Sequence, residues 1–165
     1  MPRPVQVWLA ISHHPAFRVG GWAYVRSDGV SLAGSAGGDR RIDAERAALA
    51  GLIAALRAPD RSRPIRLHTT SALAAAIPAR VKAAQAGENP PTENLDLWVQ
   101  ATAALAGGPV QIVPAPETPG TPSAFAAAWA ELARDRAKDK GPFTAVIPKS
   151  NLLKAGVDAA HDRQW

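Results

Sequence analysis

Two kinds of hydrophobic spacing divide the chain into predicted strands and predicted helices. Val5–Ile11 carries apolar residues at both alternating positions, which is typical of a strand buried on both faces in the middle of a sheet. Arg40–Arg57 instead places leucine and isoleucine at i, i+3, i+4 and i+7 from Leu49, which predicts an amphipathic helix. Glu45 lies four residues before Leu49, so a carboxylate falls at the edge of the face that this helix turns to the core.

The remaining segments extend this pattern into an ordered series. Besides Val5–Ile11, the predicted strands are Trp22–Arg26, Val30–Gly34, Ile65–Thr70 and Val110–Val113. Besides Arg40–Arg57, the predicted helices are Ala72–Ile77, Ala79–Ala86, Asn94–Leu105 and Ser123–Lys138. Three strands followed by alternating helices and strands predict an α/β fold. Its five-stranded mixed sheet is first antiparallel, then parallel, and is flanked by helices.

Local features set the expected boundaries of these elements. The glycine-rich Ser35–Asp39 is expected to be a connection between elements. Ser71 is expected to cap a short helix that ends before Pro78, because proline lacks the backbone donor that a helix needs. In the last helix, Ala124–Trp129 and Leu132 are expected to face the core.

The final segment, Gly141–Trp165, follows the predicted domain 1–140 as a tail. It contains apolar residues within Phe143–Ile147 and a short predicted helix that starts at Ser150. A tail with this much apolar material either docks on its own domain or binds a partner protein, and the sequence leaves both alternatives open.

Composition excludes several classes of protein. The 165 residues contain no cysteine, which excludes disulfides, thiolate metal sites and a cysteine nucleophile. No apolar run is long enough to span a bilayer, and the N-terminus lacks the pattern of a signal peptide, so we expect a cytoplasmic protein without a membrane partner. The formal net charge of +5 and the pI near 10.2 permit binding to nucleic acid.

Five short motifs occur in the order and at the spacings of one known family. They are GGWA at Gly20–Ala23, DAE at Asp43–Glu45, TTS at Thr69–Ser71, NLDLW at Asn94–Trp98 and AELA at Ala130–Ala133. On these motifs the chain from Val5 to Lys138 resembles type I ribonuclease H, and NLDLW is the most distinctive match. The resemblance implies a ribonuclease H-like fold, which agrees with the predicted order of strands and helices.

The resemblance also implies a chemistry. The family hydrolyses the RNA strand of RNA–DNA hybrids with two Mg²⁺ ions held by four carboxylates. Carried over to this chain, the four ligand positions fall on Ala10, Glu45, Thr70 and Ala130, so one carboxylate remains. Two divalent ions about 4 Å apart need several charged oxygen ligands. Mg²⁺ is therefore expected for the family, whereas these residues predict no retained metal site and no cofactor here.

A shift of register does not supply the missing carboxylates. Pro2–Ser27 and Arg61–Gly87 contain no Asp or Glu, and Leu97–Ala130 contains only Glu117. The two predicted strands that should each carry a ligand therefore offer none. These observations predict that the ancestral site is vestigial and that the chain does not catalyse hydrolysis.

Glu45 would be left without metal ions and would need other partners. A half-buried carboxylate is costly unless it is paired, and the candidates are His68, Thr70 and Arg41. A simpler alternative is that Glu45 stabilises the positive end of the helix dipole and pairs locally with Arg41 or Arg46.

The candidate nucleic-acid contacts lie where the resemblance places the substrate. They are His13, His14, Arg40, Arg41, Arg80 and Lys82. Adjacent histidines on an extended backbone point apart, so His13 and His14 are poor chelators, and a plain loop role is the simpler alternative. The basic end of the last helix, Arg134–Lys140, is either a solvated face or a phosphate-binding surface.

Three functional hypotheses follow from these residues. The first is a catalytically inactive ribonuclease H-like module that binds RNA–DNA hybrid or structured RNA without cleavage. The second is an adaptor that contacts a protein partner through Gly141–Trp165. The third, which the missing carboxylates disfavour, is a metal-dependent hybrid nuclease that uses Glu45, Glu117 and histidines.

Overall fold

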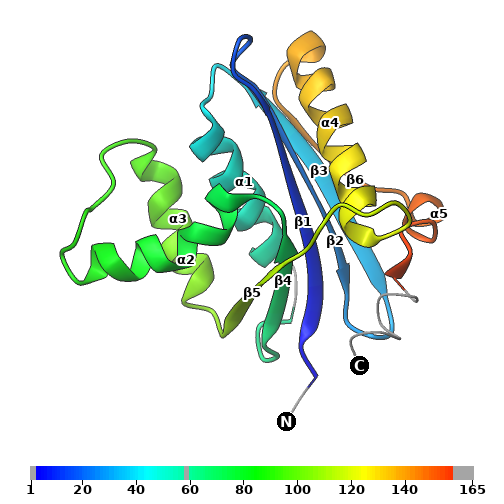
Figure 1. The fold of residues 1–165 in the computed structure, drawn as a ribbon, viewed down its shortest axis with the longest axis horizontal. Helices are drawn as coiled ribbons and strands as arrows, with labels where there is room; N and C mark the ends of the chain where they lie inside the picture. The colour runs from blue at the N-terminus through cyan, green and yellow to red at the C-terminus, as the bar shows by residue number, and fades with distance from the viewer. Residues whose placement is uncertain (1–2, 58–59, 158–165) are drawn as a thin grey trace.

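The fold is built on one mixed sheet. The computed structural model describes residues 3–57 and 60–157, and its sheet has the strand order β5-β4-β1-β2-β3-β6 (Figure 1). The strands are β1 (Val5–His14), β2 (Val19–Ser27), β3 (Leu32–Arg40), β4 (Ile65–Thr69), β5 (Val110–Pro114) and β6 (Phe143–Val146). β1, β2 and β3 are antiparallel neighbours, β4 and β5 run parallel to β1, and β6 is antiparallel to β3.

The predicted α/β class and the change from antiparallel to parallel pairing are confirmed, but the sheet has six strands instead of five. The sixth strand comes from the tail, where Phe143–Val146 pairs with Ser35–Gly38 of β3. The five residues between Pro142 and Pro148 are too few for their alternation to stand out in the sequence. They form a strand because the edge of β3 offers backbone hydrogen-bond partners to them.

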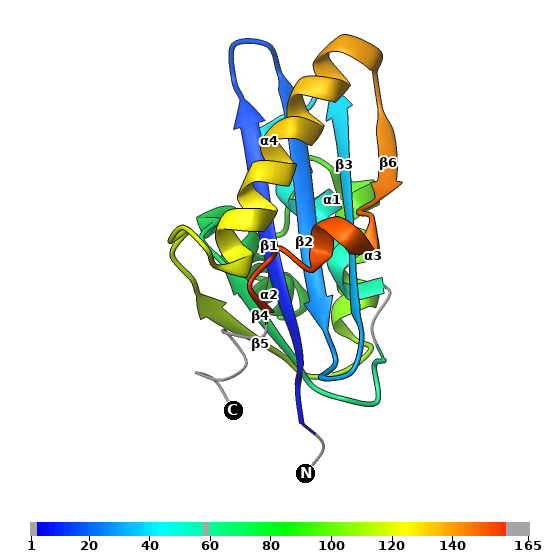
Figure 2. The ribbon, with the colours of Figure 1, turned by 90° about the vertical axis from the view of Figure 1, so that its right-hand side faces the viewer.

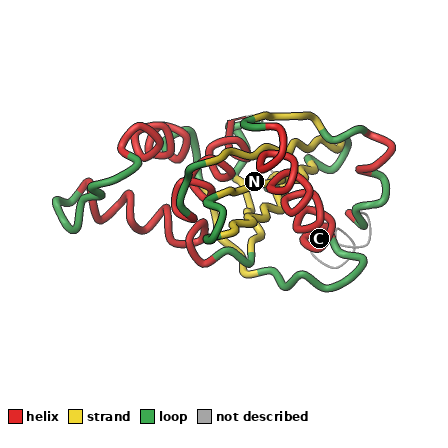
Figure 3. Tube along the Cα trace, turned by 90° about the horizontal axis from the view of Figure 1, so that it is seen from above, coloured by secondary structure: helices red, strands yellow, loops and turns green. Residues whose placement is uncertain are grey.

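Helices cover both faces of the sheet. They are α1 (Ala44–Arg57), α2 (Ala72–Gln85), α3 (Leu95–Leu105), α4 (Pro122–Lys140) and α5 (Lys149–Leu152). α1, α2 and α3 lie on one face, and α4 and α5 lie on the other (Figure 1, Figure 2). Seen from above, α2 and α3 extend away from the sheet as a lobe (Figure 3). None of these helices is long and apolar enough to cross a membrane.

Large aliphatic side chains hold α1 to the sheet. Leu49, Leu52 and Leu56, which form the predicted stripe, are at most 1% exposed and pack against apolar side chains of β1, β2 and β4. The predicted amphipathic helix is therefore confirmed. It starts at Ala44 and not at Arg40, because β3 continues through Arg40 before the chain turns.

α4 approaches the other face of the sheet closely because small residues meet there. Its inward residues are alanines: Ala126, Ala130, Ala133 and Ala137. A Cβ added to Gly21 of β2 would lie 2.3 Å from the Ala130 carbonyl oxygen, which is closer than real Cβ contacts. The expectation that Leu132 faces the core is wrong: it is 61% exposed, because a leucine does not fit this narrow interface.

The glycine-rich segment expected to be a connection is part of β3. A Cβ at Gly37 would lie 2.5 Å from the Trp22 ring, and one at Gly38 would lie 2.7 Å from the Ala133 carbonyl oxygen. These glycines are therefore required by close packing on the two faces of the sheet and not by a turn. Sequence alone does not separate these two uses of glycine.

α2 continues through Pro78, so the expected helix end before this proline is wrong. The predicted cap is confirmed, because the Ala74 N–H donates to Ser71 Oγ at 3.1 Å. Val81, one turn beyond the proline, is 7% exposed and packs in the core cluster of this face. Burial on the far side of Pro78 thus outweighs the one backbone hydrogen bond that proline removes.

The described part of the tail packs on the domain. Ile147, Leu152 and Val157 are 1 to 3% exposed and belong to the apolar cluster beneath α4. The Ile147 N–H also donates to the Gly34 carbonyl oxygen at 2.9 Å. Docking therefore applies to residues 141–157 of the segment Gly141–Trp165, and residues 158–165 lie outside the described residues.

Candidate functional site

Of the four positions that correspond to metal ligands in the resembled family, only one carries a carboxylate. Ala10 on β1 and Ala130 on α4 are 3% and 0% exposed and share the apolar cluster beneath α4. Thr70, directly after β4, is exposed and donates from Oγ1 to Glu117 Oε1 at 2.8 Å. Within residues 3–57 and 60–157, no three His, Asp or Glu side chains gather closely enough to hold a metal ion.

Glu45, the fourth position, is held by side chains from α2 and from the residue before α3. Its Oε1 accepts a hydrogen bond from the Arg80 guanidinium at 2.5 Å, and its Oε2 accepts one from Asn94 Nδ2 at 2.9 Å. The Arg80 guanidinium also lies 4.4 Å from the centroid of the Trp98 ring. Both oxygens of Glu45 are thus engaged in contacts between helices. The Arg80 guanidinium supplies the positive charge that compensates this half-buried carboxylate.

The expected partners of Glu45, namely His68, Thr70 and Arg41, are wrong. His68 and Thr70 pair with other residues, and the Glu45 oxygens are taken by Arg80 and an asparagine. Arg80 reaches Glu45 because α2 runs without a break through Pro78 to Gln85 and packs against α1. The partner of this carboxylate therefore depended on the continuity of α2 across a proline where the sequence pattern predicted a break between two helices.

A second ion pair joins the starts of α1 and α3. Arg46 donates from two guanidinium nitrogens to the two oxygens of Asp96 at 3.0 and 2.9 Å. These hydrogen bonds lower the pKa of Asp96 to about 2 and raise the pKa of Arg46. Asn94, in left-handed backbone conformation, contacts both Arg46 and Glu45. The motif Asn94–Trp98 therefore fastens α3 to α1.

His68 lies inside the sheet and away from Glu45. It is 2% exposed, stacks on Trp8 with ring centroids 5.1 Å apart, and its Nε2 lies 2.6 Å from Gln6 Oε1. Burial, with a smaller contribution from the charge of Arg66, lowers the pKa of His68 to about 4. His68 is therefore a neutral core residue at physiological pH.

Acidification is expected to destabilise the fold through His68. Between pH 6.5 and about 4, the unfolded chain binds a proton at this imidazole and the folded chain does not, so stability is lost as pH falls through this window. The loss reaches about 3 kcal/mol at pH 4. Urea unfolding of the protein between pH 7.5 and 4 measures it. His68→Gln should flatten the dependence, whereas His14→Gln, a change at an exposed histidine, should leave it unchanged.

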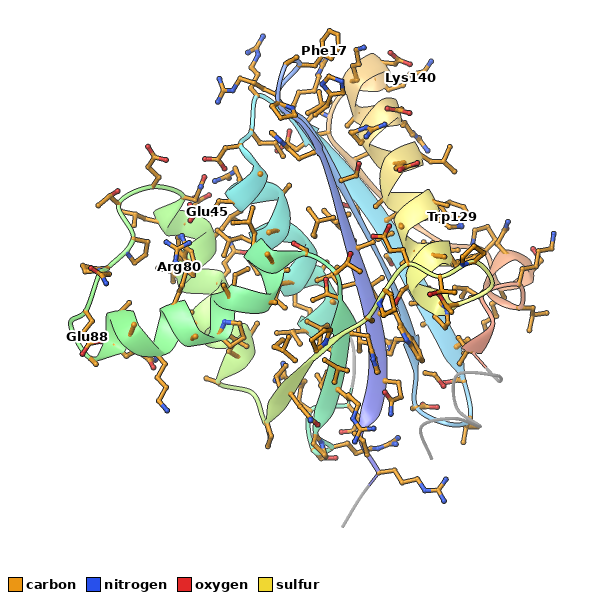
Figure 4. The ribbon with its side chains drawn as sticks, in the orientation of Figure 1. Phe17, Glu45, Arg80, Glu88, Trp129 and Lys140 are labelled. Atoms are coloured by element: carbon orange, nitrogen blue, oxygen red, sulfur yellow. The ribbon has the colours of Figure 1, made fainter. Side chains whose placement is uncertain are left out.

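Two loops that carry candidate residues are tied together at one end of the sheet. His13 Nε2 donates to the Ile42 carbonyl oxygen at 2.9 Å, and the Ile42 N–H donates to the Arg18 carbonyl oxygen at 3.0 Å. The turn between β1 and β2 and the loop between β3 and α1 thus form one surface. α4 ends beside them, and Phe17 and Lys140 lie at the same end of the molecule (Figure 4).

This end of the molecule carries five exposed cations, which we name the basic end. They are Arg18, Arg40, Arg41, Lys138 and Lys140. None of the five is in an ion pair with another residue of the described ranges 3–57 and 60–157. Their charge is therefore available to an anionic ligand, although Asp39 and Asp139 lie beside them in the chain.

The structure brings some of the candidate nucleic-acid residues together and separates others. His13, His14, Arg40 and Arg41 lie at the basic end, whereas Arg80 is engaged with Glu45 on the lobe. Lys82 is exposed on α2 of the same lobe. Two residues at the basic end, Phe17 and Arg18, did not stand out in the sequence. Their position in the turn between the first two strands is the feature of the sequence that could have pointed to them.

Comparison with known proteins gives a likeness in structure only. No protein-family model matches the sequence, and a comparison with curated proteins finds no match. The N-terminal RNase H domain of a Mycobacterium tuberculosis protein, solved as a fusion with maltose-binding protein, is 20% identical with a TM-score of 0.60. That match covers 82% of this chain and 96% of that chain.

Two further solved structures resemble this chain to the same degree. LC9-RNase H1, a type 1 RNase H with the type 2 active-site motif, is 18% identical with a TM-score of 0.61, over 94% of this chain and 86% of that chain. A foamy viral protease–reverse transcriptase in complex with double-stranded DNA is 15% identical with a TM-score of 0.61, over 79% of this chain and 93% of that chain. The strand order, the helices on both faces and these matches together establish that the chain has the ribonuclease H-like fold.

Proposed function

We propose that this protein binds nucleic acid, with RNA–DNA hybrid or structured RNA as the ligand, and does not cleave it. The observation that carries the proposal is the basic end, where five exposed cations from three segments lie together and none has an ion-pair partner in the described part of the chain. Unpaired cations of this kind contact phosphates and release the counterions that surround a nucleic acid. The fold supports the proposal, since one similar structure is a complex with double-stranded DNA.

The absence of cleavage is proposed from the chemistry of the four ligand positions. Ala10 and Ala130 offer methyl groups inside an apolar cluster, and Thr70 offers a neutral hydroxyl. The carboxylate of Glu45 is neutralised by the Arg80 guanidinium. Divalent metal catalysis requires charged oxygen ligands that hold the ions and activate water, and these residues supply one such group that is already paired.

Binding of a short RNA–DNA hybrid at several salt concentrations tests the first half of the proposal. We expect affinity to fall steeply with salt, and Arg18→Gln/Arg41→Gln to weaken binding and to reduce the slope of log K against log salt by about 2. Lys149→Gln/Lys154→Gln removes the same charge from exposed lysines elsewhere and should leave the slope nearly unchanged. Absence of binding at low salt would contradict the proposal.

The same preparation tests the second half. The RNA strand of the hybrid is expected to stay intact with Mg²⁺ or Mn²⁺, as judged by denaturing gel electrophoresis. Metal-dependent cleavage that disappears in Glu45→Gln would show that the chain is an active nuclease and would overturn this part of the proposal. Cleavage that persists in Glu45→Gln/Glu117→Gln identifies a contaminating nuclease, whereas cleavage that is lost only in this double variant would also overturn this part of the proposal.

A further inference from the structure

The turn between β1 and β2 presents an aromatic ring at the basic end. Phe17 is 55% exposed, although a phenylalanine side chain is ordinarily buried. It lies at the tip of the sheet, at the same end as Lys140 (Figure 4). The position is not needed for the core, because neither apolar cluster of the domain includes Phe17.

The Phe17 ring is fixed in place by its neighbours. Lys138 Nζ lies over the ring, 3.6 Å from its centroid, and the His14 ring lies 4.8 Å away with a tilt of 51°. A cation over one face of an aromatic ring stabilises its position and loses little by remaining exposed. The ring is therefore ordered before any ligand arrives, which reduces the entropy lost on binding.

The backbone around the ring is also held in an uncommon conformation. Arg18 and Arg41 both have positive φ, at 51° and 60°, where a residue other than glycine costs of the order of 1 kcal/mol. The two residues are joined through Ile42, whose N–H donates to the Arg18 carbonyl oxygen. Glycine would relieve this strain, so the presence of arginine at both positions points to a use for the two guanidinium groups.

We infer that the basic end binds a single-stranded segment of nucleic acid, with an unpaired base stacked on the exposed part of Phe17 that Lys138 does not cover, and the adjoining phosphates on Arg18 and Arg41. This inference rests on the proposed function and names the part of the ligand that the site takes. A base stacks on an aromatic face only when that base is not already stacked in a duplex, whereas cations alone contact phosphates of any nucleic acid.

A membrane surface fits the same residues less well. Insertion into a bilayer interface is favoured by several apolar side chains on one exposed surface, and here one aromatic ring stands between His14 and Arg18. Stacking needs only one exposed ring near cations, and here Lys138 lies over the Phe17 ring and Arg18 follows it in the chain. The ligand that uses every group on this surface is therefore a hybrid or duplex that continues into an unpaired strand.

Binding of two fluorescent RNA–DNA hybrids, one blunt and one with a single-stranded overhang, tests the inference by fluorescence anisotropy. The wild-type protein should bind the overhang substrate more tightly. Phe17→Ala should remove most of this preference, at least about five-fold in affinity for the overhang substrate, and should leave the blunt hybrid nearly unaffected. Phe17→Trp should retain the preference, because a larger ring also stacks.

Val30→Ala is the matched control. Val30 is 97% exposed in the turn between β2 and β3, so the variant removes an exposed apolar side chain from another turn of the same sheet. It should leave both affinities unchanged. If the wild type binds both hybrids and Phe17→Ala weakens them equally or not at all, the inference fails and nucleic-acid binding stands. If the wild type binds neither hybrid but binds anionic phosphatidylserine vesicles through Phe17, the proposed function and the inference both fail.

Discussion

The variant Ala130→Asp is expected to be largely unfolded at neutral pH, although it restores a carboxylate that the resembled family uses. Ala130 is fully buried, and its backbone lies against Gly21 at the closest contact between α4 and the sheet. An ionised carboxylate there would be desolvated in an apolar cluster, and the cation one turn further along α4, Arg134, already donates to Ser12 Oγ and Asp135. Its burial therefore costs about 4 kcal/mol or more. That loss is comparable to the whole stability of a small domain.

Two features make this expected result specific. Ala128→Asp places the same side chain on the exposed side of α4 and should change the free energy of unfolding little. Burial raises the pKa of an unpaired carboxyl, so the cost of Ala130→Asp should shrink as pH falls and the group becomes neutral. Circular dichroism during urea unfolding, with and without Mg²⁺, measures both variants. A stable Ala130→Asp protein that Mg²⁺ stabilises further would mean that the position still faces a metal site.

Leu152→Ala is expected to lower the free energy of unfolding by about 2 to 5 kcal/mol. Leu152 belongs to the tail, yet it is 2% exposed in the cluster beneath α4. Its Cδ2 lies 3.0 Å from where a Cβ on Gly34 would stand, so it fills the space that a glycine of β3 leaves open. Truncating it creates a cavity next to a backbone that cannot move inward to close it.

The neighbouring residue provides the control for this experiment. Leu153→Ala removes the same atoms from a side chain that is 78% exposed, and it should change stability by no more than about 0.5 kcal/mol. Urea unfolding followed by Trp fluorescence compares the two variants. If Leu152→Ala were as stable as the wild type, the tail would contribute little to the stability of the domain. Residues 1–140 would then be the independent folding unit that the sequence suggests.

Hydrophobic spacing was sufficient to predict which face of a helix is buried where the buried side chains are large. The stripe of Leu49, Leu52 and Leu56 marks α1 because three leucines on one helical face have no other stable place than a core. It was insufficient for α4, whose inward face is alanine and whose Leu132 faces solvent. Alanine carries little hydrophobic signal of its own, and the close fit to Gly21 is a property of two segments far apart in the chain.

In the candidate site, too, some features could be predicted from the sequence and others could not. The missing carboxylates at positions 10, 70 and 130 are a matter of residue identity, and no arrangement of the chain supplies them. The partner of Glu45 is a matter of which helix lies beside α1: the sequence named Arg80 as a candidate nucleic-acid contact, and only the packing of α2 against α1 brings it to Glu45. The three cations of the turn and loop, Arg18, Arg40 and Arg41, likewise become one surface only through the hydrogen bonds of Ile42.

The sequence by itself determined the order of the first five strands and the absence of carboxylates at positions 10, 70 and 130, because both depend on residue type and spacing along the chain. The tertiary structure decided the sixth strand, the burial of Ile147 and Leu152, the pairing of Glu45 with Arg80 and the placement of Lys138 over Phe17. Each of these needs contacts between residues distant in sequence, whose free energies are set by the neighbours that folding supplies.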